Sequence, residues 1–453
     1  MKKAILGVTL FVLAIVAYSF WTDFALVLRL TKDGEFIESI KRLVGYNVPE
    51  TTDLPIARPD IDDDQDGLGF LNVPEGFRIS VAAKGLDNPR VIVFDSKNRM
   101  LVSETKAGRV RIMDDKNGDG EFETKNILIE NLRSPHGLVF FVEGEITYLY
   151  IAEIHQVARY AYDDNTGTLI EKIGANIATF PQDGGHFTRT ILFGPNWRDR
   201  DLVKGTFPIG GFYSNDKLYI SVGSSCDVCV ENTWKRGAIL ESDPQGTFTG
   251  EFAGGLRNSV FFTFHPETHE IWATEMGRDE LGDDLPPDEV NIVKVAGPEH
   301  KFGARRFGWP FCYGNKIKDE TFKPEKIERI DIPTDCSETD APAIELPAHS
   351  APLGLAFTTS DKWPSQWKND LLVAYHGSWN RSEPTGYKIV RFKVDEKGKL
   401  FETSDFITGW LSDPPAGGKK KVYGRPVDLK FGPDGNLYIS DDAGGIVYKL
   451  EPK

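Results

Sequence analysis

Apolar and polar residues alternate in short runs along most of the chain after residue 70, and these runs recur in a fixed order. Each repeat begins with an apolar segment such as "GLVFF", continues through a polar turn to one such as "LYIS", and adds a third such as "GRVRIM". Alternation with a period of two is typical of β-strands that bury one face. The repeats occupy residues 88–113, 135–162, 189–242, 257–277, 352–394 and 425–451.

Strands of this kind cannot bury their apolar faces alone, so the six repeats must pack on one another. We therefore expect an all-β fold, a six-bladed β-propeller closed around a central channel. The earlier segment "GFRISVAA" at 76–83 is expected to complete the last repeat and close the ring. Unequal spacing between the repeats predicts long connecting loops, where rigid scaffolds usually carry function.

A hydrophobic segment precedes this domain. Residues 4–21 are mostly apolar and follow the basic start "MKK", the pattern of an export signal. The run is long enough to cross a membrane once, and no small-x-small cleavage site stands out after it. We therefore expect an uncleaved N-terminal helix that anchors the chain to the inner membrane, with Lys2 and Lys3 inside and the bulk of the chain periplasmic. A cleaved signal peptide is the alternative.

This pattern divides the chain into three parts. We expect a signal anchor or signal peptide at 1–29, a linker at 30–69, which contains "VPETTDLPIARPD", and the propeller at 70–453.

The charge balance narrows the range of partners. The formal net charge is −15, and the only short basic run is "GGKKK" near residue 420. An acidic surface repels phosphate backbones, so we expect no nucleic-acid partner. A small neutral molecule meets no such barrier.

Export to an oxidising compartment changes how the four cysteines are interpreted. In an oxidising compartment the "CDVC" pair, Cys226 and Cys229, is expected to form a disulfide rather than a redox or zinc site. Cys312 and Cys336 are then expected to pair, although four cysteines permit three pairings. Haem c attachment would need a histidine after Cys229, where the chain has Val230.

Two aspartate-rich turns resemble the first half of a calcium loop. "DDDQDG" at 62–67 and "DKNGDG" at 115–120 place oxygen ligands at alternate positions before a glycine. Neither has glutamate at the twelfth position, so neither is a complete EF-hand loop. A solvated turn and a structural calcium site both remain open.

Two segments contain the first candidate catalytic and binding residues. "PQDGGHFTRT" places His186 after two glycines, and a neutral imidazole near pH 7 is a natural proton acceptor. "GGLRNSV" places Arg257 and Asn258 at the start of a blade, where side chains face the propeller axis. An unreactive loop histidine and an ion pair between blades are the structural alternatives.

Three later segments add candidates at corresponding positions. The acidic run 275–291 contains a glycine turn that could present carbonyl oxygens to a cation, although a solvated loop is the simpler interpretation. "YHGSWNRS" brings His376, Asn380 and Arg381, and "YGRPVDL" brings Arg425. Together with Arg257, these arginines predict a cationic end of the channel that an anionic ligand would neutralise.

The segments "GGHFTRT", "GLRNSV", "GRDELGDDLPPDE", "FGWPFCYGN", "HGSWNRS" and "GRPVDL" resemble the glucose/sorbosone dehydrogenase family. The resemblance covers roughly residues 70–453, and its motifs are specific only when taken together. It implies a six-bladed propeller that uses pyrroloquinoline quinone (PQQ) and calcium. PQQ carries three carboxylates, which agrees with several cations in the channel.

The resemblance implies roles for particular positions. His186 corresponds to the base that takes a proton from the sugar hydroxyl. The carbonyl groups of Gly277 and Arg278 correspond to ligands of the calcium ion. The positions that correspond to cofactor-binding residues are Arg257, Asn258, Arg425 and, with a less certain alignment, Arg381 or Lys388.

The chain departs from the soluble glucose enzymes at several of these positions. They carry Asp before the catalytic histidine, where this chain has Gly185, and Pro at the calcium turn, where it has Arg278. Tyr423 stands in place of a second arginine in the last blade. The chain therefore looks closer to the sorbosone-type branch, and its substrate is not taken from the glucose enzymes.

These features lead to one functional hypothesis and two alternatives. We expect PQQ- and calcium-dependent oxidation of a sugar, either an aldose, sorbosone or a related polyol, outside the cytoplasm. Electrons would pass to an external carrier, a cytochrome or a quinone, because the chain has no haem motif. The alternatives are a binding propeller that has lost the cofactor and a calcium-dependent lactonase-like hydrolase.

Overall fold

The computed structural model of the protein describes residues 54, 56–57, 67–174, 176–197, 216–298, 300, 303–327, 329–412 and 420–453. The predicted N-terminal helix at 4–21, most of the linker and most of the 62–67 turn lie outside the described residues. Within the described residues, no helix is both long and apolar enough to cross a membrane. The short helices described there are 3-10 turns, such as Leu68–Phe70.

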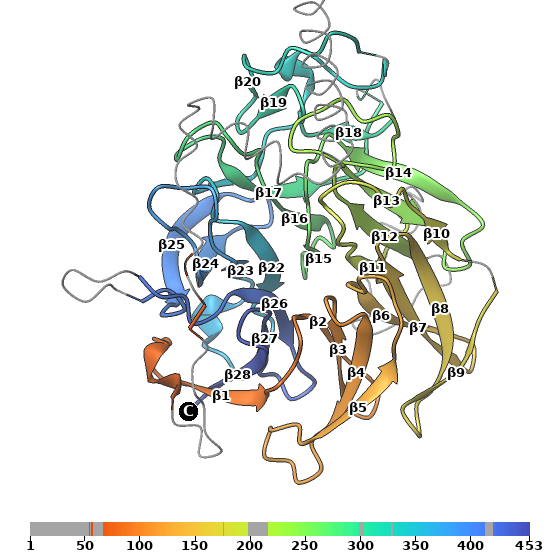
Figure 1. Ribbon diagram of the computed structural model, residues 1–453, viewed down its shortest axis with the longest axis vertical. Helices are drawn as coiled ribbons and strands as arrows, with labels where there is room; N and C mark the ends of the chain where they lie inside the picture. The colour runs from red at the N-terminus through yellow and green to blue at the C-terminus, as the bar shows by residue number, and fades with distance from the viewer. Residues whose placement is uncertain are drawn as a thin grey trace, which may run out of the picture. The chain divides into compact units, whose positions relative to one another are not determined.

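Six sheets, antiparallel except for one added strand in blade 3, form the ring that the repeats predict (Figure 1). Blade 1 contains β2 (Pro89–Phe94), β3 (Met100–Glu104), β4 (Arg109–Asp114) and β5 (Thr124–Ile129). Blade 2 contains β6 (Leu138–Glu143), β7 (Ile146–Glu153), β8 (Gln156–Asp163), β9 (Thr168–Lys172) and β10 (Ala178–Thr179). Blade 3 contains β11 (Ile191–Gly194), β12 (Lys217–Val222), β13 (Ala238–Ser242), β14 (Thr249–Gly254) and the short β18 (Arg305–Arg306).

The second half of the ring repeats this arrangement. Blade 4 contains β15 (Phe262–Phe264), β16 (Ile271–Glu275), β17 (Asp288–Val293) and β21 (Ile344–Leu346). Blade 5 contains β22 (Pro352–Phe357), β23 (Leu371–Tyr375), β24 (Lys388–Val394) and β25 (Leu400–Ile407). Blade 6 contains β26 (Pro426–Phe431), β27 (Leu437–Asp441), β28 (Ile446–Pro452) and β1 (Phe77–Ala83). A separate hairpin joins β19 (Cys312–Tyr313) and β20 (Ile317–Lys318).

The ring closes as the sequence predicts. Strand β1 pairs antiparallel with β28, with Ile79 opposite Leu450, so the two ends of the domain share blade 6. The alternation did not reveal β18, which follows blade 4 in the chain but adds to blade 3 in parallel with β14. The connection from blade 4 to its outer strand β21 therefore crosses back to the neighbouring blade.

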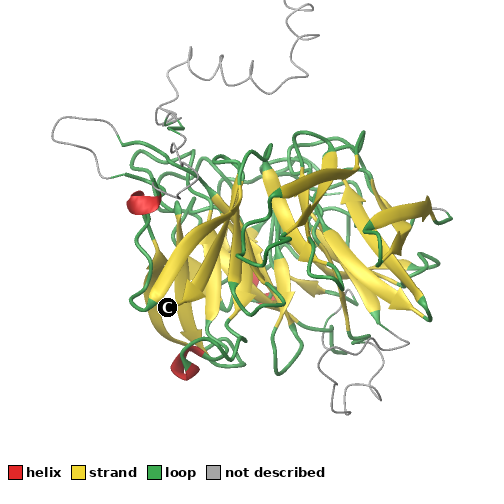
Figure 2. Cartoon of the chain, turned by 90° about the horizontal axis from the view of Figure 1, so that it is seen from below, coloured by secondary structure: helices red, strands yellow, loops and turns green. Residues whose placement is uncertain are grey.

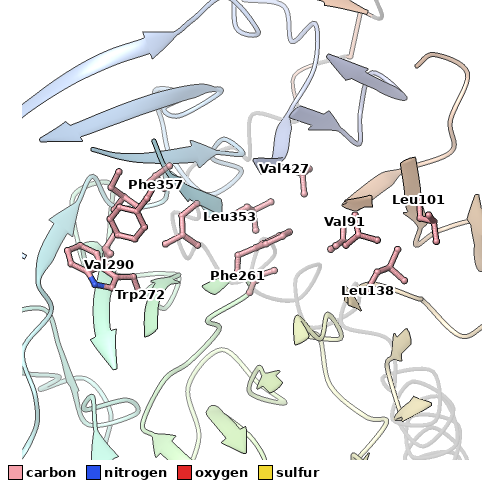
Figure 3. Packing of buried hydrophobic residues seen from close by; sticks show 14 of the residues in the cluster. Val91, Leu101, Leu138, Phe261, Trp272, Val290, Leu353, Phe357 and Val427 are labelled. Carbon is pink, nitrogen blue, oxygen red and sulfur yellow. The ribbon is translucent and has the colours of Figure 1, made fainter. Parts of the chain in front are cut away.

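The core follows the innermost strands. Buried side chains from five blades, Val91, Leu138, Phe261, Leu353 and Val427, surround the axis (Figure 3). Within blades 4 and 5, Trp272 and Phe357 meet edge to face with ring centroids 5.3 Å apart. Such packing of inner faces explains why each first strand is almost continuously apolar.

The antiparallel pairing also determines where functional loops meet. The start of each first strand and the end of each second strand lie at the same end of a blade. The loops gather at the two ends of the strands (Figure 2). Residues before β15 and β26 and after β12, β16 and β23 therefore lie at one end of the channel.

Both predicted disulfides are present. Cys226 is bonded to Cys229, and Cys312 is bonded to Cys336. The first lies in the loop after β12, at the end of the channel that carries the candidate residues.

Candidate active site

His186 lies in the loop between β10 and β11, partly buried. Its Nδ1 atom is 3.1 Å from the carbonyl oxygen of Ser224 and 2.9 Å from the Ser224 hydroxyl oxygen. A carbonyl can only accept a hydrogen bond, so Nδ1 carries the proton and Nε2 keeps its lone pair. No described residue makes a hydrogen bond to Nε2. The imidazole is therefore held as the tautomer that a base requires.

The two glycines before His186 differ in backbone conformation and in the space around them. Gly184 has a φ of +92°, and a Cβ there would collide with Ser225 in the loop after β12. Gly185 has open space around it, and its amide donates to Ser225 O at 3.3 Å. Gly184 thus permits the close approach of the two loops. The described contacts around Gly185 do not require a glycine.

Buried Arg189 holds the backbone of the same loop through hydrogen bonds. The Arg189 side chain is 1% exposed and donates from Nη1 to the carbonyl oxygens of His186 and Thr188 at 2.8 and 2.7 Å. No described carboxylate pairs with it, and burial lowers the pKa of Arg189 to about 9. The backbone of His186 is therefore held independently of its ring.

The surroundings of His186 keep the ring neutral. Burial, and then the nearby Arg257 guanidinium, lower the pKa of His186 to about 3. Both effects penalise the imidazolium form. A lone pair on Nε2 is thus available throughout the neutral pH range.

Gly223 separates His186 from Asn258. A Cβ at Gly223 would lie 2.6 Å from both the His186 Cβ and the Asn258 Oδ1. The backbone of Asn258 is fixed because its amide donates to Glu275 Oε1 at 2.6 Å. The predicted base and the predicted cofactor-binding amide are therefore neighbours at one end of the channel.

Arg257 is held by two carboxylates. Its Nη2 atom is 2.8 Å from Asp227 Oδ1 and 3.1 Å from Asp279 Oδ2, and its Nε donates to Asp227 O at 2.9 Å. The side chain is 6% exposed. Burial raises the pKa of Asp279, and the positive charge of Arg257 opposes that rise. The ion pair between blades, which was the structural alternative for Arg257, is therefore present. It lies beside the predicted base.

The turn at Gly277 and Arg278, which the resemblance assigned to calcium, is fixed by a buried carboxylate. The Gly277 amide donates to Asp288 Oδ1 at 2.9 Å, and a Cβ there would lie 2.8 Å from Pro286 Cγ. Among the described residues, none donates a hydrogen bond to the carbonyl oxygen of Gly277 or Arg278. The Arg278 guanidinium lies 2.8 Å from Asp319 Oδ2. These carbonyl groups are thus available as oxygen ligands.

Arg425 differs from Arg257 in its partners. It donates to Gly377 O at 3.0 Å and to the Tyr387 hydroxyl at 3.1 Å, and it lies over the Tyr387 ring at 4.9 Å. In the described part of the chain no carboxylate pairs with it. Its charge is therefore available to an anionic ligand.

His376 lies beside Arg425 in an ion-paired cluster. Its Nε2 atom is 2.9 Å from Asp442 Oδ1, and Asp442 Oδ2 accepts from Arg90 at 2.7 Å. Hydrogen bonds from Arg90 and His376 hold the pKa of Asp442 well below its usual range, although burial opposes the shift. Burial lowers the pKa of His376 itself. The cluster joins blades 5, 6 and 1 at the same end of the ring.

The structure corrects the expectation that three arginines converge without counterions. Arg381 donates to the carbonyl of Asp283 and pairs with Asp284 Oδ1 at 3.0 Å in an outer loop. Lys388, the alternative at this position, pairs with Asp405 at 2.5 Å on the outer strand β25. Of the arginines Arg257, Arg381 and Arg425, only Arg425 lacks a carboxylate partner among the described residues, so repulsion does not require a ligand at the other two.

Sequence reasoning missed the residues that hold these groups. Ser224, Asp227 and Asp279 lie beside the predicted site, and Asp442 supports His376. One signal was present, because Asp227 lies between the two cysteines of "CDVC".

The aspartate-rich turn at 115–120 lies away from this site, between β4 and β5. One carboxylate oxygen from each of Asp115, Asp119 and Glu123 lies within 4.8 Å of the others.

Comparisons with known proteins agree with this architecture. The TrAA12-like family profile matches residues 71–453. An uncharacterized protein of Borreliella burgdorferi is 36% identical over 389 residues, covering 84% of this chain and 90% of the relative. A pyrroloquinoline quinone-dependent pyranose dehydrogenase of Coprinopsis cinerea is 26% identical over 429 residues, which cover 84% of this chain but 54% of that enzyme.

Solved structures explain the partial coverage. The holo form of the PQQ domain of the Coprinopsis cinerea pyranose dehydrogenase is similar with a TM-score of 0.65 and 22% identity. The match covers 87% of this chain and 98% of that domain. At this identity the structural likeness concerns the fold alone. The family expected from the motifs is thus confirmed in a broader form, while the sorbosone-type branch stays a prediction. The chain belongs to the TrAA12-like family.

Proposed function

We propose that this protein is a PQQ- and calcium-dependent dehydrogenase that oxidises a sugar, with His186 as the general base. The observation that carries the proposal is the fixed tautomer of His186, whose Nε2 lone pair has no described partner beside Asn258. The relative from Coprinopsis cinerea is named as a PQQ-dependent pyranose dehydrogenase and supports the same class of reaction.

The residues present fit an anionic, planar cofactor. Arg425 offers a guanidinium without a described carboxylate partner, and Asn258 offers a side-chain amide. Gly223 lets Asn258 and His186 lie close together, because a Cβ there would lie 2.6 Å from both residues. These residues, with Arg257, would hold the carboxylates of PQQ. Arg381 is the weakest member of the proposed set because its contacts are to Asp283 and Asp284.

The carbonyl groups of Gly277 and Arg278 would hold the calcium ion. Hard cations prefer carbonyl and carboxylate oxygens, and no described donor occupies these two carbonyl oxygens. The adjacent Asp288 carboxylate fixes the turn through the Gly277 amide. The calcium ion would act as a Lewis acid toward the cofactor.

His186 would take the proton of the hydroxyl that is oxidised. Its Nδ1–H group is held by Ser224, so the proton enters at Nε2, and its low pKa keeps it unprotonated before substrate binds. PQQ, when bound, would supply the acceptor for the hydride removed from the sugar carbon. An external carrier, a cytochrome or a quinone, would receive the electrons.

We place this activity outside the cytoplasm. Two disulfides are present, and such bonds persist in oxidising compartments. Attachment to the inner membrane through residues 4–21 is part of the same proposal.

Titration of the purified protein with PQQ, followed by its ultraviolet–visible absorption with and without calcium, tests the proposal. We expect saturable binding that calcium strengthens, and dye reduction with at least one member of a panel of aldoses. Absence of PQQ binding under both conditions would overturn it and favour the binding propeller. Lactone hydrolysis that needs calcium but not PQQ would favour the hydrolase.

A further inference from the structure

We propose that the CDVC loop, residues 224–229, is the positioning element that aligns the base with the cofactor-binding arginine, and that Asp227 is its central positioning residue. The inference deepens the proposed function and rests on it. The loop touches His186 at one end and Arg257 at the other.

Asp227 contacts three separate segments of the chain, at residues 257, 278–279 and 309. Its Oδ1 accepts from Arg257 Nη2 and from the Asp279 amide, each at 2.8 Å. Its backbone carbonyl accepts from Arg257 Nε at 2.9 Å and from Trp309 Nε1 at 3.1 Å. Its Oδ2 lies 3.7 Å from Arg278 Nε. One residue therefore fixes the direction of the Arg257 guanidinium and the amide that follows the proposed calcium turn.

The other end of the loop fixes the base. Ser224 accepts from the His186 Nδ1–H group, and its own amide donates to Arg257 O at 2.7 Å. The Ser225 amide and hydroxyl both donate to Glu231, which anchors the loop to the following segment. The base and the arginine thus share one short stretch of backbone.

The disulfide holds these two ends in one conformation. Cys226 and Cys229 enclose Asp227, and the Ser224 hydroxyl donates to Cys226 O at 2.6 Å. The Asp227 side chain is 34% exposed, and an ion pair with that exposure contributes little unless its geometry is fixed in advance. Closing the loop covalently removes alternative backbone conformations and so fixes that geometry. We infer that the disulfide acts on alignment as well as on stability.

Three variants test this inference. Asp227→Ala removes the carboxylate, Asp227→Asn keeps one acceptor oxygen, and the double variant Cys226→Ser/Cys229→Ser opens the loop. The matched control is Asp405→Ala, which removes a half-exposed aspartate paired with Lys388 on blade 5. Amide hydrogen exchange of Asp279 and the imidazole ¹⁵N shifts of His186 are measured in the protein without cofactor. PQQ dissociation constants are measured with calcium.

We expect Asp227→Ala to speed exchange at the Asp279 amide and to weaken PQQ binding, each by about ten-fold or more. Asp227→Asn should keep both the exchange rate of the Asp279 amide and the PQQ affinity closer to the wild-type values. Asp405→Ala should change neither quantity. The double cysteine variant should convert His186 from the Nδ1–H form to a mixture of tautomers. Unchanged exchange and unchanged tautomer in Asp227→Ala and the double variant would overturn the inference. Because these two readouts need no cofactor, they remain decisive if the wild-type protein fails to bind PQQ, a result that would overturn only the proposed function.

Discussion

His186 and Asn258 meet across Gly223, where an added Cβ would lie 2.6 Å from the His186 Cβ and from the Asn258 Oδ1. Asn258 is 8% exposed, and its backbone amide is bonded to Glu275, so neither neighbour can withdraw easily. The absence of a side chain at Gly223 is therefore a condition for the geometry of the site.

Gly223→Ala should consequently separate the base from the amide. Overpacking at a buried position costs about 1–3 kcal/mol, so the variant should remain folded with a lower free energy of unfolding. We expect PQQ affinity and kcat to fall together by about ten-fold or more. Cofactor titration and dye reduction measure the two effects.

Gly185→Ala is the matched control. A Cβ at Gly185 would meet nothing within 4 Å, and its backbone does not need a left-handed conformation. This variant should keep both PQQ affinity and kcat. Equal losses in the two alanine variants would show that backbone freedom, and not the contact between His186 and Asn258, matters.

His186→Asn tests the base itself. Positioned general bases contribute about 10²–10⁴-fold, so kcat should fall by that factor while PQQ binding changes little. His155→Gln, in the turn between β7 and β8, is the control and should retain wild-type kcat. A His186→Asn variant with wild-type turnover would assign the proton transfer to another group.

The pKa of His186 also makes stability depend on pH. The folded-state pKa is lowered to about 3 by burial and by Arg257, while an unfolded chain has a histidine pKa of about 6.5. The unfolded state thus binds the proton more strongly, so the stabilising contribution is complete above pH 6.5 and is lost as the pH falls toward 3.

Urea unfolding of the wild type and of His186→Gln at several pH values isolates this contribution. Between about pH 7 and pH 5 the wild type should lose about 2 kcal/mol more than the variant, because the other histidines are common to both. Parallel pH profiles would mean that His186 titrates normally in the folded protein. The pH profile of kcat/KM reports the ionisation of the free enzyme, so it should likewise show no acid limb near pH 6.5 from His186.

The sequence predicted the features that depend on local patterns. Alternation located all six blades, the strand at residues 76–83 before the first repeat predicted ring closure, and export predicted both disulfides. The sequence also placed Arg257 at the start of a blade, and this residue lies in the loop that leads into β15. Each of these follows from residues that are close in the chain or from one repeated spacing.

The partners of these residues could not be predicted in the same way. Ser224 is 38 positions from His186, and Asp227 is 30 positions from Arg257, in connections whose lengths differ between blades. Polar contacts between such loops depend on the twist and packing of neighbouring blades. His186 illustrates the point, because its Nδ1 contacts the backbone carbonyl of Ser224, a group that no residue type reveals.

Arg425 and Arg257 should respond differently to the same substitution. Arg425 has hydrogen bonds to Gly377 and Tyr387 but no described carboxylate partner. Arg425→Gln should therefore cost only about 1 kcal/mol of folding free energy, the value of ordinary hydrogen bonds. It should weaken PQQ binding by about ten-fold or more, because a charge-assisted contact to the cofactor is lost.

Arg257→Gln leaves Asp227 and Asp279 without their shared counterion. Because the Asp279 carboxylate is largely buried, we expect a loss of about 2 kcal/mol or more in the free energy of unfolding, larger at neutral pH than at pH 4. The sign follows because burial already raises the pKa of Asp279, and without Arg257 it rises further, so acid relieves the uncompensated charge. Urea unfolding without cofactor separates the two arginines. If Arg425→Gln destabilises the protein as much as Arg257→Gln does, Arg425 serves the fold and its assignment to the cofactor is wrong.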